Sequence, residues 1–264
     1  MKNILFPTDF SQASINALPF ALATAQKTKA KVVIVHAYQV PRNTHLSGID
    51  IKRRAEEKIQ QLLAEQPATL LKKVTISSFV MLANKLQLLH HLAKACDLVI
   101  MGTKQLTRWY NQRWERITLQ LMKTIKTPLI VIPEHYTFKK FQKIVFSVDN
   151  APIRDRKGLQ ILKELTSRFQ AELILFHTEE QATDRGIHYS VLASFDDTAD
   201  YRVDYNFIQK DTLSSIRDMV SDYNVDLVGL VRRKRNWLQS IFHQSITEQE
   251  VLESQVPLLI LHDD

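Results

Sequence analysis

The sequence predicts an α/β protein with two tandem open parallel sheets of five strands each, and with helices on both faces. The first observation is that short apolar runs alternate with longer amphipathic stretches, as in parallel strands joined by crossover helices. The second is the stretch 96–133, where an apolar run ends near Gly102, a helical pattern follows, and Pro128 opens another apolar run. The third is that the same order of features returns later in the chain, which indicates a duplicated domain.

In the first half the elements can be assigned in order. Ser11 and Asn84 are expected to cap the helices after the first and third strands, because their side-chain oxygens can accept from free N–H groups at a helix start. Pro67 is expected to end the second helix. The expected strands are 3–9, 31–38, 74–82, 98–101 and 128–132, and the charged second helix is expected over 51–65.

The second half repeats these features at nearly constant distances. The matching pairs are Asp9 and Asp149 (140 residues apart), His36 and His177 (141), Asp97 and Asp226 (129), and Pro128 and Pro257 (129). The drop from 141 to 129 predicts that the second copy is shortened between its second and fourth strands. We therefore expect two domains, residues 1–137 and residues 138–264.

Composition narrows the class of protein. Hydrophobic residues make up 45% of the chain and charged residues 24%, as in ordinary globular proteins. The apolar run near the first residues is shorter than expected for a signal peptide, and no apolar run reaches the ~18 residues of a membrane helix, so no membrane partner is expected. Cys96 is the single cysteine, which is typical of a reducing compartment, and we expect a cytoplasmic protein.

The net charge of +7 is unevenly distributed along the chain. Residues 1–137 carry a net charge of +11 and residues 138–264 a net charge of −4. The basic half can therefore face the acidic half of the same chain, and net charge alone is a poor argument for nucleic-acid binding. Nucleic acid is accordingly not an expected partner.

Three features of each half resemble tandem universal stress proteins. They are a first strand ending in Asp (ILFPTD and IVFSVD), a second strand ending in His (VIVHA and LILFH), and a later block that begins DLV and ends PLI or PLL. The resemblance covers nearly the whole chain. It implies the adenine-nucleotide α-hydrolase-like fold with sheet order 3-2-1-4-5. It also implies that the two halves pair through their fifth strands as a pseudo-dimer.

In this family, members that bind ATP carry a Gly-x2-Gly-x9-Gly-Ser/Thr pattern after the fourth strand. Glycine lets the backbone approach phosphate, and N–H groups at the helix start hold the anion. The corresponding residues are Gly102, Gln105, Glu115 and Arg116 in the first half, and Val231, Lys234, Gln244 and Ser245 in the second. Only Gly102 and Ser245 match, so both phosphate sites are predicted to be eroded.

The candidate site residues each have a structural alternative. Asp9 and Asp149 match the acidic position that contacts adenine or ribose in the family, but an Asp at a strand end also caps the next helix, and capping is favoured. The nucleotide-binding candidates are Asp9, Gly102, Asp149, Lys234 and Ser245. An anion-binding patch of side chains is formed by Arg232, Arg233 and Arg235. For this patch a solvated loop is the favoured alternative.

The resemblance and the eroded glycine pattern lead to one expected function and one alternative. We expect a cytoplasmic, non-catalytic stress-response protein that binds a protein partner or a small ligand, without firm ATP binding, without a metal, and with a homodimer as one assembly. The alternative is a sensor that binds ATP or another adenine nucleotide mainly through the second domain. An enzyme acting on nucleotides would need a general base and Mg²⁺ ligands, and no such set is evident in the sequence.

Overall fold

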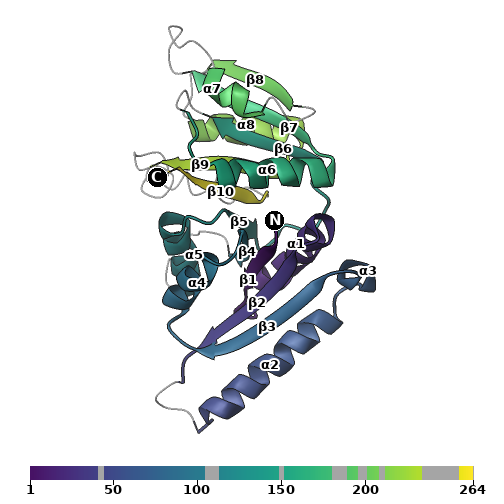
Figure 1. The fold of residues 1–264 in the computed structure, drawn as a ribbon, viewed down its shortest axis with the longest axis vertical. Helices are drawn as coiled ribbons and strands as arrows, with labels where there is room; N and C mark the ends of the chain where they lie inside the picture. The colour runs from purple at the N-terminus through teal and green to yellow at the C-terminus, as the bar shows by residue number, and fades with distance from the viewer. Residues whose placement is uncertain are drawn as a thin grey trace. The chain divides into compact units, whose positions relative to one another are not determined.

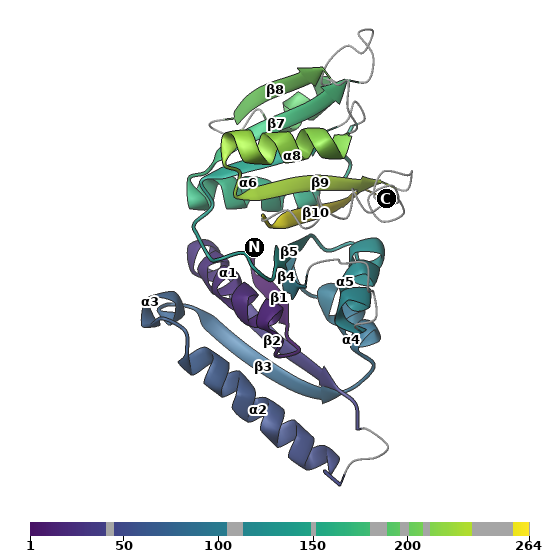
Figure 2. The ribbon, with the colours of Figure 1, turned by 180° about the vertical axis from the view of Figure 1, so that it is seen from behind.

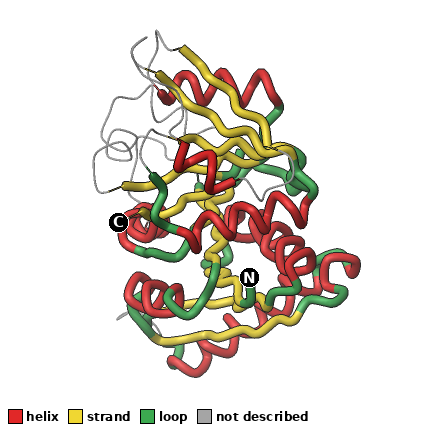
Figure 3. Tube along the Cα trace, turned by 45° about the horizontal axis from the view of Figure 1, so that its top comes forward, coloured by secondary structure: helices red, strands yellow, loops and turns green. Residues whose placement is uncertain are grey.

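The computed structural model describes residues 1–40, 45–104, 113–148, 152–179, 189–195, 201–207, 212–233 and 256–263. They form two compact units, which meet along the chain between Phe138 and Lys139. Strands and helices alternate along most of the described residues (Figures 1 and 3). Of the helices within these residues, none is both long enough and apolar enough to cross a membrane.

The first unit has its strands in the order β3-β2-β1-β4-β5, and each strand is parallel to its neighbours. Its elements are β1 (Asn3–Pro7), α1 (Gln12–Thr28), β2 (Lys31–Tyr38), α2 (Gly48–Ala64), α3 (Ala68–Leu71), β3 (Thr75–Leu82), α4 (Lys85–Ala93), β4 (Leu98–Thr103), α5 (Arg113–Thr124) and β5 (Leu129–Pro133). This is the predicted order 3-2-1-4-5.

The inner strands of the first unit are buried and the outer strand β3 is not. All six residues of β4 are buried, as expected for a strand covered on both faces. Because parallel connections are right-handed, α1 and α2 cover one face, and α4 and α5, which contact each other, cover the other. The helix α2 runs along β3 (Figure 2), yet Phe79, Met81 and Leu82 of β3 remain exposed.

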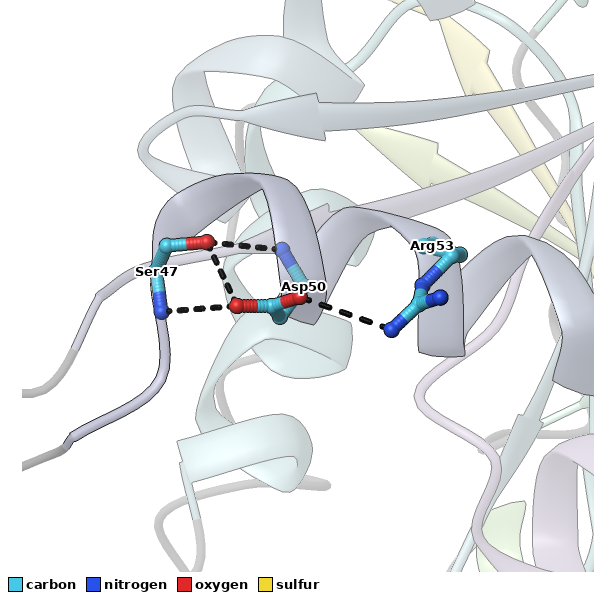
Figure 4. Close-up of polar contacts among 3 residues, drawn as sticks. All are labelled: Ser47, Asp50 and Arg53. Atoms are coloured by element: carbon cyan, nitrogen blue, oxygen red, sulfur yellow. Dashed lines mark hydrogen bonds and ion pairs between the residues drawn. The ribbon is translucent and has the colours of Figure 1, made fainter.

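The start of α2 is set by a reciprocal cap (Figure 4). The Oγ of Ser47 accepts from the N–H of Asp50 at 3.1 Å, and the Asp50 carboxylate accepts from the N–H of Ser47 at 3.3 Å. Hydrogen bonds from Ser47 lower the pKa of the exposed Asp50 carboxyl, and Arg53 at 3.5 Å adds to the effect. The helix therefore begins earlier than Ile51, where apolar periodicity alone placed it.

The second unit has the order β8-β7-β6-β9-β10, again with parallel neighbours. Its elements are β6 (Lys143–Val148), α6 (Arg156–Phe169), β7 (Glu172–Glu179), α7 (Tyr189–Leu192), the 3-10 turn η1 (Ala193–Phe195), β8 (Tyr201–Phe207), α8 (Thr212–Tyr223), β9 (Leu227–Arg233) and β10 (Leu258–Asp263). An α/β fold with a mostly parallel sheet and helices is therefore confirmed.

The two units repeat details of side-chain bonding. In each, an aspartate directly before the fourth strand accepts two backbone N–H groups at the start of the first strand. The bonds run from Lys2 and Asn3 to Asp97 Oδ2 (2.7 and 3.0 Å), and from Gln142 and Lys143 to Asp226 Oδ2 (2.7 and 3.0 Å). Each aspartate thus ties the fourth strand of its unit to the first strand.

Candidate ligand site at the carboxyl ends of the strands

In an open parallel sheet, ligands bind beyond the carboxyl ends of the strands, where the strand order reverses. In the first unit this point lies beside β1, which has β2 on one side and β4 on the other. The residues there come from the β1–α1 turn, the ends of β2 and β4, and the helices α2 and α4. The same point in the second unit lies beside β6.

Side-chain hydrogen bonds order the β1–α1 turn from within. The Oγ1 of buried Thr8 lies 2.9 Å from Ser14 Oγ and accepts from the N–H of Phe10 at 3.1 Å. The Oδ1 of Asp9 accepts from the N–H of Ser11 at 3.0 Å, and Ser11 itself caps α1. Capping of α1 by Asp9 was the favoured alternative, but the cap is Ser11, which was also predicted from sequence, and Asp9 instead orders the turn before it.

Gly102 lies inside β4 and serves packing. It pairs in register with Ile132 of β5, so the strand continues past the position where its end was predicted. A Cβ atom at residue 102 would lie 2.0 Å from the carbonyl oxygen of Ala13 and 2.8 Å from the backbone nitrogen of Ser14. The glycine is required because the first turn of α1 crosses β4 at backbone contact distance.

A half-buried histidine stands at the carboxyl end of β2. His36 Nδ1 lies 2.9 Å from the carbonyl oxygen of Thr8. Because a carbonyl only accepts, Nδ1 carries the proton, and in the neutral ring Nε2 is left as an acceptor. The centres of the His36 and Phe10 rings lie 4.4 Å apart. The ammonium of Lys58, a residue of α2, lies 5.5 Å from the centre of the Phe10 ring.

The pKa of His36 is lowered below its ordinary value of 6.5. Burial of the ring is the main cause, and the positive charges of Lys85 and Lys58 act in the same direction. The hydrogen bond to the Thr8 carbonyl and the charge of Asp9 oppose the shift. His36 is therefore held in the neutral form at neutral pH.

This shift predicts a pH-dependent loss of stability on the acid side. Below its ordinary pKa of 6.5, the unfolded chain takes up a proton at His36 that the folded protein resists. The free energy of unfolding therefore falls as the pH drops from 6.5 through the folded pKa, and this contribution is intact above 6.5. Urea unfolding should show a smaller loss for His36→Gln than for the unmodified protein between about pH 7.5 and about pH 5.5.

The exposed His91 on α4 provides the control for this measurement. His91→Gln makes the same substitution at an exposed position, so it shows how much of any change in the pH profile comes from replacing a histidine by glutamine. Equal pH profiles for His36→Gln and the unmodified protein would contradict the assignment of the effect to His36.

The second unit has a histidine at the same position of the repeat, and its side chain is more deeply buried than that of His36. His177 Nδ1 lies 3.0 Å from the carbonyl oxygen of Val148, and the side chain is 3% exposed. Its Nε2 is buried and has no hydrogen-bond partner among the described residues. The predicted candidates Asp149, Lys234 and Ser245 lie outside the described residues, as does Arg235 of the arginine patch.

The remaining two arginines of the patch belong to a strand. Arg232 and Arg233 were predicted to follow the fourth strand, but β9 includes both, because β10 continues the ladder opposite them through His262 and Asp263. Arg232 is half-buried on β9. The solvated loop, which was the favoured alternative, is therefore wrong for these two residues, and anion binding by them stays a prediction.

The structure adds residues that sequence reasoning missed. Phe10, Lys58 and Lys85 surround His36, yet each comes from a different part of the chain. The aromatic residue directly after Asp9 was the one signal in the sequence, and nothing in the helical pattern singles out either lysine. An imidazole acceptor, an aromatic ring and lysine ammonium groups suit a planar or anionic ligand. Among the described residues, no group of three metal-ligating side chains occurs.

Comparison with known proteins identifies the family from the first unit. Residues 1–133 match the sequence profile of the Universal stress protein family. A search of curated proteins finds no match to the chain.

Solved structures share the fold over both units. A universal stress protein from Archaeoglobus fulgidus DSM 4304 is 15% identical, with a TM-score of 0.73 and coverage of 99% of this chain and 98% of that one. A functionally unknown protein from Pseudomonas aeruginosa PAO1 is 12% identical, with a TM-score of 0.59 and coverage of 100% and 93%. The cytoplasmic domain of a prokaryotic cation chloride cotransporter is 10% identical, with a TM-score of 0.57 and coverage of 98% and 94%. Since the family profile matches just over half of the residues, the chain belongs to the universal stress protein family.

Proposed function

We propose that this protein is a cytoplasmic, non-catalytic member of the family that acts in stress response by binding a partner, without firm ATP binding. The observation that carries the proposal is the position of Gly102. A phosphate cradle needs glycines that leave room for the anion beside free backbone N–H groups. Here the space beside Gly102 is filled by the backbone of Ala13 and Ser14.

Two further features support a protein without turnover. The hydroxyl groups of Thr8 and Ser14 bond to each other, and the Asp9 carboxylate accepts from the turn that it orders. These polar groups of the β1–α1 turn are used in holding the turn. A phosphoryl-transfer enzyme would instead direct a base and metal ligands at its substrate.

An adenine-nucleotide sensor in the second unit is the second candidate. The observation in its favour is the buried Nε2 of His177, which has no partner among the described residues and would be satisfied by a donor on a ligand. In this candidate Asp149 contacts the base or ribose, while Lys234 and Ser245 hold phosphate. ATP would then bind to one unit without being hydrolysed.

The assembly of the two units is part of the proposal. β5 and β10 are each the outermost strand on one side of their own unit, and the residues of β5 up to Ile132 and of β10 up to Leu261 are apolar. Exposed apolar edge strands need a partner. Pairing of β5 with β10 within the chain would join the two five-stranded sheets predicted from the sequence into one continuous sheet. The second unit would then be a second domain of the same family. A protein partner or a second copy would bind the resulting surface.

Isothermal titration of the whole protein with ATP, ADP and AMP tests the ligand assignment. We expect no heat of binding at high micromolar nucleotide, with and without Mg²⁺. Native mass spectrometry of protein purified without added nucleotide should likewise give the mass of the chain alone or of its dimer.

Two variants separate the first candidate from the second. If heat or a bound nucleotide is found, His177→Phe should abolish it and His36→Phe should leave it intact when the second unit is the site. Loss in both variants, or ATP turnover by the unmodified protein, would overturn both proposals. Thermal unfolding of each variant checks that the fold is retained.

A further inference from the structure

Lysines collect at the amino ends of the strands in the first unit, at the edge opposite the candidate ligand site. Each strand there is entered from a short segment: residues 1–3, 26–31, 66–75, 93–98 and 123–129. We call the lysines of these segments the amino-edge lysines. They are Lys2, Lys27, Lys29, Lys31, Lys72, Lys73, Lys94, Lys123 and Lys126. They are nine of the 19 lysines and arginines in residues 1–137.

Strand pairing brings these segments together in a row. Lys31 at the start of β2 pairs in register with Asn3 of β1 and with Thr75 of β3. The N–H of Lys31 donates to the carbonyl oxygen of Lys2 at 2.8 Å, and the N–H of Asp97 donates to that of Asn3 at 2.9 Å. Neighbouring strands lie about 4.8 Å apart, so five strand starts extend over roughly 19 Å.

Ion pairs with the described residues neutralise little of the charge of this row. Apart from Lys123, none of the amino-edge lysines forms an ion pair with a described residue. Asp97 is the one acidic residue in the five segments, and its Oδ2 accepts from the backbone of Lys2 and Asn3. Lysines at helix ends also offset the helix dipole, but this explains the last turns of α1, α4 and α5 and leaves Lys2, Lys31, Lys72 and Lys73 unexplained.

The residue types in the row indicate the chemistry of a ligand. The five segments contain neither arginine nor an aromatic residue. Proteins that hold nucleic acid commonly add aromatic rings for stacking on bases and arginines for base edges. Lysine ammonium groups alone act as point charges, which suits binding of phosphate groups and provides no recognition of bases.

We propose that the amino-edge lysines bind a linear chain of phosphate groups without bases, that is, inorganic polyphosphate. A flexible polyanion can follow the row and release its counterions to solution at each strand start. This site is separate from the candidate ligand site at the carboxyl ends, so failure of the nucleotide titration has no bearing on it.

The test compares two triple variants of the full chain with the same loss of charge. Lys27→Gln, Lys72→Gln and Lys94→Gln remove exposed charges from three segments of the row. Lys52→Gln, Arg53→Gln and Arg54→Gln remove three exposed charges from α2. Binding of inorganic polyphosphate is measured by titration at several salt concentrations, with single-stranded oligothymidine and polyglutamate as competitors, and thermal unfolding checks each fold.

The edge variant should bind polyphosphate about tenfold more weakly, with a salt slope smaller by about two, since each phosphate contact contributes about 0.7 for a single-stranded polyanion. The α2 variant should keep both values close to those of the unmodified protein. Equal losses in the two variants would show an effect of net charge and overturn the proposal. Tighter binding of oligothymidine or polyglutamate than of polyphosphate would overturn it as well, by assigning the edge to nucleic acid or to an acidic protein.

Discussion

Gly102→Ala is expected to lower the free energy of unfolding by about 3 kcal/mol, because overpacking against backbone cannot be relieved by a change of rotamer. The new Cβ atom would lie 2.0 Å from the carbonyl oxygen of Ala13 and 2.3 Å from its carbonyl carbon. Relief requires that the first turn of α1 move away from β4, where the bonds of Thr8 and Ser14 hold it. Urea unfolding followed by circular dichroism measures the change.

Gly48→Ala is the matched control for this substitution. A Cβ atom at residue 48 would meet Val40 Cγ2 at 3.5 Å and Tyr38 Oη at 4.0 Å, which are ordinary contacts. Gly48 opens α2, where alanine also reduces the freedom of the unfolded chain, so we expect a change of less than about 1 kcal/mol, of either sign. A Gly102→Ala protein as stable as Gly48→Ala would contradict the packing role and return Gly102 to a role in ligand contact.

Asp226→Ala is expected to cost about 3 kcal/mol of unfolding free energy, because it removes a buried charged acceptor from two part-buried backbone donors and from an ion pair. The buried Asp226 carboxylate accepts from the backbone of Gln142 and Lys143 and forms an ion pair with Lys139 at 2.6 Å. Its loss releases the start of β6 from β9, two strands that form the centre of the second unit. Denaturant unfolding of the whole chain gives the change.

The first unit supplies the matched control, since Asp97 makes the same pair of backbone bonds. Asp97 is half-buried, whereas the Asp226 side chain is 6% exposed, so water can replace part of what Asp97→Ala removes. We expect a loss of about 1 to 2 kcal/mol there. Asp226→Asn keeps an acceptor without the charge, so its loss of unfolding free energy should lie between the losses of Asp97→Ala and Asp226→Ala. A larger loss for Asp97→Ala than for Asp226→Ala would refute the dependence on burial.

Sequence patterns were sufficient for the strands of the first unit and their order, but β8 of the second unit was not predicted. The apolar runs located the strands of the first unit, and the caps at Ser11 and Asn84 were predicted because a capping side chain bonds to a neighbouring turn. The start of α2 was missed because the reciprocal cap of Ser47 and Asp50 lies before the first apolar position of the helix. Strand positions and helix caps depend on residues that are close together in the sequence, so they can be predicted from it.

The candidate site was less accessible to sequence reasoning. Asp9 was expected to cap α1, whereas it orders the turn before the helix. Phe10, Lys58 and Lys85 were not associated with His36. They come from a turn and two helices that meet only when the sheet is assembled. The amino-edge lysines are likewise scattered in the sequence, and strand pairing turns them into a row.

Periodicity and repetition along the chain thus established the α/β class, the duplicated pattern of elements and the family resemblance. All three depend on neighbouring residues or on constant distances in sequence between matching residues of the two halves. The role of each repeated residue was decided only by packing. Gly102 matched a phosphate-loop glycine in sequence, yet its backbone contact with Ala13 makes it a packing residue. In the sequence, Asp97 and Asp226 were identified only as residues at matching positions of the repeat. Their role is shown by the structure, since their hydrogen bonds join residues far apart in the chain.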